Sequence, residues 1–110
     1  MRIYICGPMT GLPEHNYPAF AAATGALVDA GYDVSSPHEI VITKPHGEPT
    51  WHDYMRAAVR MLTHCDAIAV LPGWEKSRGA LVEIDLARAL DMPVFAVADL
   101  VEKAPLVVAP

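Results

Sequence analysis

The sequence is poor in the residues that mark several classes of protein. It holds only two cysteines, Cys6 and Cys65. Both lie beside apolar runs, so we expect two buried, reduced thiols rather than a disulfide. Lys and Arg number 8 against 13 Asp and Glu, which gives a formal charge of −5, and no basic run is present. This balance argues against polymeric nucleic acid as a partner.

Long apolar runs are also missing. No stretch approaches the roughly 20 apolar residues that a membrane-spanning helix needs. Met1 runs directly into a predicted strand, without the basic, apolar and cleavable segments of a secretory signal. We therefore expect a cytoplasmic protein with no membrane partner.

Known ligand-binding fingerprints are absent as well. The five histidines lack the spacing of a metal site. Neither the glycine pattern of a dinucleotide-binding turn nor a Walker phosphate loop occurs. We expect no metal and no cofactor.

What remains is a compact, apolar chain. Of its 110 residues, 53% are hydrophobic and 19% are charged. This composition predicts one globular domain, residues 1–110, with a single core.

Strands and helices are predicted to alternate along this domain. Short apolar runs predict strands at 2–6, 32–35, 66–71 and 93–97. Helical spacing predicts helices at 17–30, 51–64 and 80–90, with Asn16 and Ser77 as N-caps of the first and third. Segments 7–16 and 37–50 are predicted loops. The end of the chain is expected to form a helical turn at 98–104 and an edge strand at 106–109.

The alternation predicts an α/β three-layer sandwich with a four- or five-stranded parallel sheet. We expect the flavodoxin-like, Rossmann-like strand order 2-1-3-4(-5). In that order the first and third strands are neighbours at the topological switch point, where ligands bind at the carboxyl ends of the strands. The loops at 7–16 and 72–78 both open there.

One acidic residue interrupts the amphipathic pattern of the third helix. On a helical wheel at about 100° per residue, Glu83 falls within the apolar arc of Gly79, Leu86, Ala87 and Leu90. A carboxylate aimed at a core costs several kcal/mol unless it is paired or is used for chemistry. Glu83 is therefore the first candidate for a functional residue.

Two stretches, IYICGPMTG near the start and CDAIAVLPGWEKSRGALVEIDLARAL later, resemble the nucleoside 2-deoxyribosyltransferase-like family. The pattern LPGWxxSxGAxxE is most similar to a small branch of that family found in phages and prophages. The resemblance implies that Glu83 attacks C1′ of a deoxyribosyl group and forms a covalent ester while the base leaves. It also implies that Tyr4 touches this nucleophile and that Ser77 and Gly79 seat the 5′ end of the sugar.

Further contacts to a small nucleoside or nucleotide are expected from the loops. The first loop would contribute Gly7, Pro8 and Met9, since Gly7 permits close approach of the backbone. Trp74 could either stack on a base or anchor its loop against the core.

Two departures from the family pattern stand out. Ala58 occupies a position where related sequences often carry an aspartate, and Asp53 is a candidate to replace the missing acid. Pro8 and Thr10 stand where nucleotide-specific members place a serine and an arginine, which predicts weaker phosphate recognition.

Three functions therefore stay open: an N-glycosidase or deoxyribosyl transferase, a nucleotide-binding module without turnover, and an interaction domain in which Glu83 is salt-bridged to an arginine. His38 and His52 could enter the crevice. Related proteins form homodimers or larger homo-oligomers, and Arg56, Arg60 or the tail 105–110 could lie in such a contact.

Overall fold

The computed structural model describes residues 1–102. They form four strands, β1 (Arg2–Cys6), β2 (Asp33–Ser35), β3 (Ala67–Val70) and β4 (Val94–Ala96). Four α-helices alternate with them: α1 (Tyr17–Asp29), α2 (Trp51–Thr63), α3 (Arg78–Ala89) and α4 (Val97–Glu102). The expected edge strand at 106–109 lies outside the described residues.

The sheet confirms the predicted topology. All neighbouring strands pair in parallel, in the order β2-β1-β3-β4. The central pair brings Cys6 opposite Val70, at the carboxyl ends of β1 and β3. The two loops that follow these strands therefore leave the sheet side by side.

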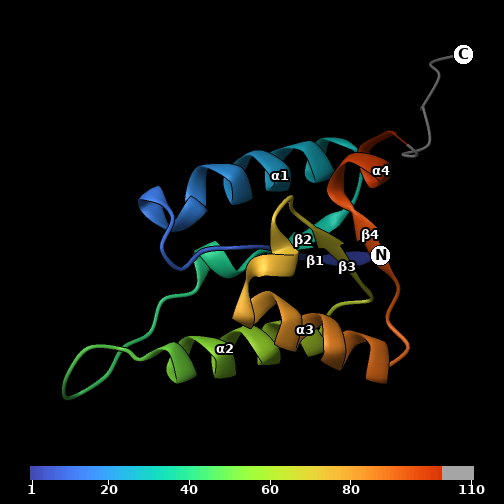
Figure 1. Ribbon diagram of the computed structural model, residues 1–110. Helices are drawn as coiled ribbons and strands as arrows, with labels where there is room; N and C mark the ends of the chain where they lie inside the picture. The colour runs from blue at the N-terminus through green and yellow to red at the C-terminus, as the bar shows by residue number, and fades with distance from the viewer. Residues whose placement is uncertain (103–110) are drawn as a thin grey trace, which may run out of the picture.

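Helices cover both faces of the sheet, as expected of a three-layer sandwich. Figure 1 shows α1 and α4 on one face and α2 and α3 on the other. Side chains alternate between these layers along each strand. On β1, Ile3 and Ile5 pack toward α1 and α4, whereas Tyr4 and Cys6 join the core of the α2–α3 layer. Strand β1 thus presents two polar groups, the Tyr4 phenol and the Cys6 thiol, to α3, the helix that carries Glu83.

The N-cap predictions had different outcomes. Ser77 caps α3 as predicted, because its side chain accepts a hydrogen bond from the Ala80 N–H at 3.2 Å. Asn16 stands at the start of α1, but its side chain does not cap the helix. It has a left-handed backbone, and its amide instead donates to the Pro8 carbonyl at 3.0 Å, which ties the first loop together.

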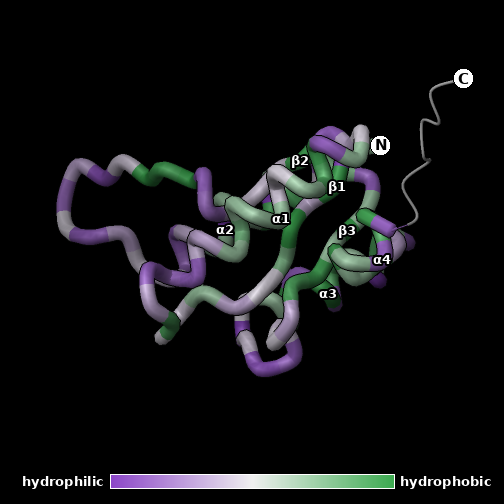
Figure 2. The backbone as a smooth tube through the Cα atoms, turned by 90° about the horizontal axis from the view of Figure 1, so that it is seen from above, coloured by the Kyte–Doolittle hydropathy of each residue, from purple (hydrophilic) through white to green (hydrophobic). Residues whose placement is uncertain are grey.

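The long segment before α2 is mostly irregular, as predicted, with one short 3₁₀ turn, η2 (Pro37–Glu39). Figure 2 shows that the segment projects well beyond the layers and carries mainly hydrophilic residues at its tip. It returns to α2 through a capping box in which Thr50 and Asp53 exchange hydrogen bonds. Two smaller 3₁₀ turns, η1 (Pro13–Asn16) and η3 (Trp74–Lys76), precede α1 and α3. Within residues 1–102, the helices are all too short or too polar to cross a membrane.

Candidate active site

Glu83 lies where the helical wheel places it, on the inner face of α3. Only 5% of its surface is exposed. The Tyr4 hydroxyl on β1 donates a hydrogen bond to Glu83 Oε2. The Cys6 thiol, two residues along the same strand, lies 3.5 Å from Oε1 and 3.7 Å from the Ala80 carbonyl. Each carboxylate oxygen therefore faces its own donor.

Burial sets the proton affinity of this cluster. Loss of water around the carboxylate raises the pKa of Glu83 from 4.5 to about 7, and the hydrogen bonds from Tyr4 and Cys6 oppose that rise. Burial, together with the nearby Glu83 charge, holds the pKa values of the Tyr4 phenol and the Cys6 thiol well above their usual values. At neutral pH both groups stay protonated and act as donors, while Glu83 is divided between its two charge states.

The Glu83 carboxylate does not form an ion pair with any cation of residues 1–102, where the single salt bridge joins Lys44 to Asp53 at 3.0 Å. The hypothesis of an interaction domain, in which Glu83 forms a salt bridge with an arginine, therefore gains no support from the described residues. Neutral donors solvate Glu83 in place of a counter-ion. Such a carboxylate keeps its charge available for an electropositive centre.

A cavity of about 380 Å³ opens in front of Glu83, and we refer to it as the Glu83 cavity. Its walls come from the loops after β1 and β2, from the first turns of α2 and from the start of α3. This is the crevice predicted at the carboxyl ends of the strands. It is lined by Gly7, Met9, Thr10, His15, Tyr17, Pro37, Ile40, Pro49, Trp51, Tyr54, Met55, Ala58, Ser77, Gly79, Ala80 and Glu83.

Most of the predicted substrate-binding residues meet in this cavity. Gly7, Met9, Ser77 and Gly79 all line it. Gly7 has a steric reason to be glycine, since a Cβ there would approach Leu71 Cβ to 2.8 Å. Tyr4 does not line the cavity but stands behind Glu83, where it can hold the carboxylate without touching a ligand.

Asp53 is placed differently. Its carboxylate accepts hydrogen bonds from the Thr50 N–H at 2.8 Å and from Lys44 Nζ at 3.0 Å, and it does not line the Glu83 cavity. These contacts, the Thr50 backbone first, lower its pKa to about 2. An acid held so firmly in its ionised form is a poor proton donor at neutral pH. Asp53 therefore caps α2, and the structure places it outside the cavity wall that contains Ala58.

Pro8 and Trp74 also lie away from the cavity walls. Trp74 is half-buried and packs against the core between the sheet and the α2–α3 layer. Of its two expected roles, the structure favours the loop anchor. The ring of Pro8 lies close to Gly73, so the loops after β1 and β3 approach each other there.

Several cavity residues had no distinctive signal in the sequence. His15, Tyr17, Trp51 and Tyr54 reach the cavity from a 3₁₀ turn and from the first turns of two helices. The backbone is left-handed at Glu14, His15 and Asn16, in the turn that connects the first loop to α1. Cys6 could have been found from strand alternation alone, because it shares a face with Tyr4.

The two histidines expected near the crevice lie outside the Glu83 cavity. His38 contacts the Ser36 hydroxyl and packs near Tyr17 and Phe20. His52 is exposed at the start of α2, with its ring against Trp51. Among residues 1–102, His, Cys, Asp and Glu side chains nowhere gather in threes as a metal site would need.

Together these features define a Rossmann-like α/β protein with a buried carboxylate in a cavity at the switch point of its sheet. Residues 1–96 match the family described as "Domain of unknown function (DUF4406)", and the chain belongs to that family. None of the proteins with curated descriptions matches it.

One solved structure with the same fold is a conserved protein from Enterococcus faecalis V583, with a TM-score of 0.68 and 19% sequence identity. The match covers 87% of this chain and 62% of that protein. The present chain thus spans less than two thirds of that structure's length. At this identity the likeness concerns the fold alone.

Proposed function

We propose that this protein cleaves the N-glycosidic bond of a small 2′-deoxynucleoside or deoxynucleotide, with Glu83 as the nucleophile. The observation that carries the proposal is the Glu83 carboxylate itself, which is buried without a cation from residues 1–102, is hydrogen-bonded by Tyr4 and Cys6, and lines a cavity of about 380 Å³. The resemblance of IYICGPMTG and LPGWEKSRGALVE to the nucleoside 2-deoxyribosyltransferase-like family, and to its phage-type branch, supports it.

The chemistry follows from the position of this charge. The ionised carboxylate attacks C1′ of the sugar, and the C1′–N bond breaks with its electron pair going to the base nitrogen, which takes up a proton. A glycosyl ester on Glu83 results. Water then attacks C1′ and loses a proton to the solvent as the bond to Glu83 breaks, which releases the free sugar and the carboxylate. Attack by a nitrogen of a second base, which loses its proton in the same way, completes a transfer instead.

The surroundings of Glu83 suit this reaction. A negative charge with little water around it stabilises the oxocarbenium-like transition state more strongly than an exposed one would. Aromatic side chains of Tyr17, Trp51 and Tyr54 offer surfaces for a base, and Ser77 stands at the N-terminus of α3, where a sugar hydroxyl or a phosphate can be bound.

The leaving base must be protonated by another group. Glu83 is the only carboxylate that lines the cavity among residues 1–102. Ala58 lies in the cavity wall, at the position where the resemblance to the nucleoside 2-deoxyribosyltransferase-like family implies an aspartate. His15, Tyr17 and Tyr54 are the other titratable side chains at the cavity. None of these three is a second carboxylic acid that could protonate the leaving base. We therefore expect the proposed enzyme to act best on bases that leave without strong acid catalysis.

Base release from a panel of 2′-deoxynucleosides and their 5′-monophosphates tests the proposal. Chromatography should detect free base with the wild type and none with Glu83→Gln. Mass spectrometry of a rapidly quenched reaction should find a deoxyribosyl group on the peptide that contains Glu83. Full activity in Glu83→Gln, or no release from any member of the panel, would contradict the proposal.

A second candidate, a nucleotide-binding module without turnover, is favoured by Ala58. Its mark would be thermal stabilisation by a deoxynucleotide with no product formed. In either case we propose a cytoplasmic homo-oligomer.

A further inference from the structure

A second hollow lies on the outer side of the α2–α3 layer, and we call it the outer groove. It has a volume of about 540 Å³. Its walls are lined by Trp51, His52, Met55, Arg56, Val59, Arg60, Arg78 and Val82. Two of these residues, Trp51 and Met55, also line the Glu83 cavity. They therefore form the wall between the cavity and the groove.

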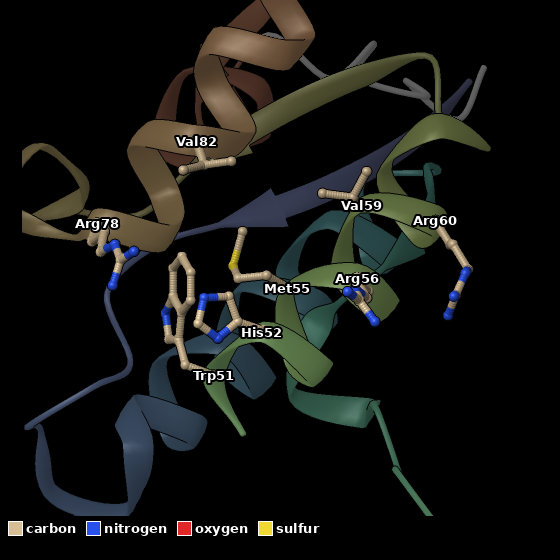
Figure 3. Close-up of a pocket in the computed structure, with 8 residues that line it drawn as sticks. All are labelled: Trp51, His52, Met55, Arg56, Val59, Arg60, Arg78 and Val82. Atoms are coloured by element: carbon tan, nitrogen blue, oxygen red, sulfur yellow. The ribbon is translucent and has the colours of Figure 1, made fainter. Parts of the chain in front are cut away.

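The indole of Trp51 is covered on one face by a cation. Trp51 begins α2 and Arg78 begins α3, and Figure 3 shows their side chains next to each other. The guanidinium lies 4.0 Å from the centroid of the indole, where the electron-rich face of the ring attracts it. Arg78 lines the outer groove and not the Glu83 cavity. The guanidinium thus covers the groove face of the indole and leaves the other face to the cavity.

Further contacts fix the indole at its edges. The His52 ring meets it almost at a right angle, with 5.3 Å between the centroids and 86° between the planes. The indole Nε1 lies 3.8 Å from the Cβ position of Gly79, and Met55 Sδ lies 3.1 Å from the same position. A methyl group at position 79 would therefore press on the wall. The glycine that follows Arg78 leaves room for the wall against α3.

Among the aromatic side chains of the cavity, Trp51 is the best prepared to bind a flat ring. Tyr17 and Tyr54 are 37% and 42% exposed, whereas Trp51 is half-buried. Within residues 1–102, Trp51 is also the one with a cation stacked on it. A side chain that is already fixed loses little freedom when a ligand binds, so more of the contact energy appears as affinity.

Trp51 also stands at a suitable distance from the proposed nucleophile. Its indole lies beside Gly79, and Gly79 and Glu83 are one turn apart on the same face of α3, about 6 Å along the helix axis. A base that rests on the indole would leave the space of a sugar between itself and the Glu83 carboxylate.

We propose that the cavity face of Trp51 binds the base of the substrate by stacking, and that Arg78 is a positioning residue that holds the indole for this contact. For the identity of the ligand, a 2′-deoxynucleoside, the inference rests on the proposed function. It gives the arginine between the Ser77 N-cap and Gly79 a role in substrate binding. Stacking of one base on an aromatic ring contributes roughly 5- to 150-fold in affinity.

Tryptophan fluorescence tests the stacking, because the chain has only two tryptophans. Each of the four common 2′-deoxynucleosides is titrated into Glu83→Gln, in which the proposed cleavage is blocked. With Trp74→Phe added, Trp51 is the single tryptophan, and at least one nucleoside should quench its emission. With Trp51→Phe added instead, the emission comes from Trp74, which packs against the core, and it should stay constant.

Substitution of Arg78 tests the positioning role. Arg78→Met keeps a long unbranched side chain without the cation. We expect it to raise the dissociation constant from the quenching titration, and KM in the active protein, by roughly 2- to 30-fold. The value of kcat should stay within about twofold, because Glu83 keeps both of its donors. Arg78→Lys should lie between Arg78→Met and wild type, since an ammonium group keeps the charge but not the planar stacking.

Arg56→Met is the matched control. Arg56 lines the same groove on α2, and Figure 3 shows it apart from the Trp51 ring. This variant should leave the dissociation constant and KM unchanged. Circular dichroism and light scattering check that the variants keep their fold and state of association. If Trp74→Phe does not fold, the emission lost between Glu83→Gln and Glu83→Gln/Trp51→Phe reports Trp51 instead.

Two results would overturn the proposal: no quenching of Trp51 by any of the four nucleosides, or equal dissociation constants in Arg78→Met and Arg56→Met. Base release by the wild type without quenching of Trp51 would leave the glycosidase proposal intact and exclude Trp51 as the base platform. Quenching of Trp51 without base release by the wild type would support the stacking and contradict the proposed catalysis. The two proposals can therefore fail separately.

Discussion

Tyr4 on β1 and Glu83 on α3 are joined by a buried hydrogen bond across 79 positions of the chain. The phenol is completely buried, and its raised pKa keeps it a donor at every physiological pH. The bond favours the ionised form of the carboxylate and so opposes the effect of burial. The charge on Glu83 thus depends on a residue from the first strand.

Removal of the Tyr4 hydroxyl should therefore weaken the proposed nucleophile. In Tyr4→Phe we expect the pKa of Glu83 to rise above about 7, so that the acid limb of kcat/KM moves to higher pH. We also expect turnover at neutral pH to fall by roughly 10- to 100-fold. Tyr32→Phe, which alters another phenol away from Glu83, is the control. Unchanged pH profiles in both variants would show that Tyr4 does not tune the carboxylate.

Cys6 should act on the other carboxylate oxygen in the same sense but more weakly, since a thiol is a poor donor. We expect Cys6→Ala to shift the acid limb to higher pH by less than Tyr4→Phe does. Cys65→Ala is a matched control, because Cys65 is also buried but its thiol faces the Met61 carbonyl. An equal shift in the two cysteine variants would argue for a general packing effect.

Glu83 should also make stability depend on pH. Its folded pKa, about 7, exceeds its ordinary value of 4.5, so the folded state holds more protons between these two values. The free energy of unfolding should therefore fall as pH rises from about 4.5 to about 7, by up to about 3 kcal/mol from this group alone. Urea titrations across this range should show the slope in wild type and in the exposed control Glu75→Gln. The titrations should not show this slope in Glu83→Gln. The same dependence of unfolding free energy on pH in wild type, Glu75→Gln and Glu83→Gln would contradict the raised pKa of Glu83.

Ala58 tests whether an acid is missing from the cavity. We expect Ala58→Asp to place a carboxyl group on the wall shared with Glu83, where like-charge repulsion raises the pKa of the new group. In its protonated form the introduced carboxyl group can then protonate the leaving base and raise turnover by about 100-fold. Ala58→Asn has nearly the same volume without the acid. An equal rise in both variants, or none in either, would exclude a proton-transfer role at this position.

Asp53 should matter for stability and not for turnover. In Asp53→Asn we expect turnover per folded molecule within about twofold of wild type, together with a lower midpoint of thermal unfolding, because the capping box loses its charged acceptor. Thr50→Ala removes the other half of the box and should cost about 1 kcal/mol. Loss of turnover in Asp53→Asn at unchanged stability would return Asp53 to the active site.

The parts of the fold that the sequence predicts well are those with a local cause. Unbroken apolar runs identify β1 and β3 as buried central strands, and the alternation of elements leads to the observed strand order. Glu83 is recognisable because a charge on an apolar arc is an anomaly on a single helix. Ser77 is recognisable because the capping bond joins residues three apart.

The remaining differences involve contacts that the helical and strand patterns do not reveal. Asp53 has the residue type and helix position of a catalytic acid, but Lys44 and Thr50 hold it for capping. The Asn16 amide is drawn to the Pro8 carbonyl, which becomes available only when the loop folds back. For Trp74 the sequence left base stacking and loop anchoring open, and its packing against the core favours the anchor. The contacts of Lys44 and Pro8 depend on how the loops fold, whereas Thr50 and Asp53 are only three residues apart and their capping pair could have been recognised in the sequence.

Strand β1 sets the register of the whole site. Its odd-numbered side chains, Ile3 and Ile5, belong to one layer and its even-numbered ones, Tyr4 and Cys6, to the other. Insertion or deletion of one residue ahead of Tyr4 would exchange the two sets and direct isoleucines at the Glu83 carboxylate. A Glu83 carboxyl group surrounded by hydrocarbon would stay protonated. A one-residue insertion or deletion in β1, far from α3 in the sequence, would therefore remove the charge of Glu83 as completely as a substitution of Glu83 itself.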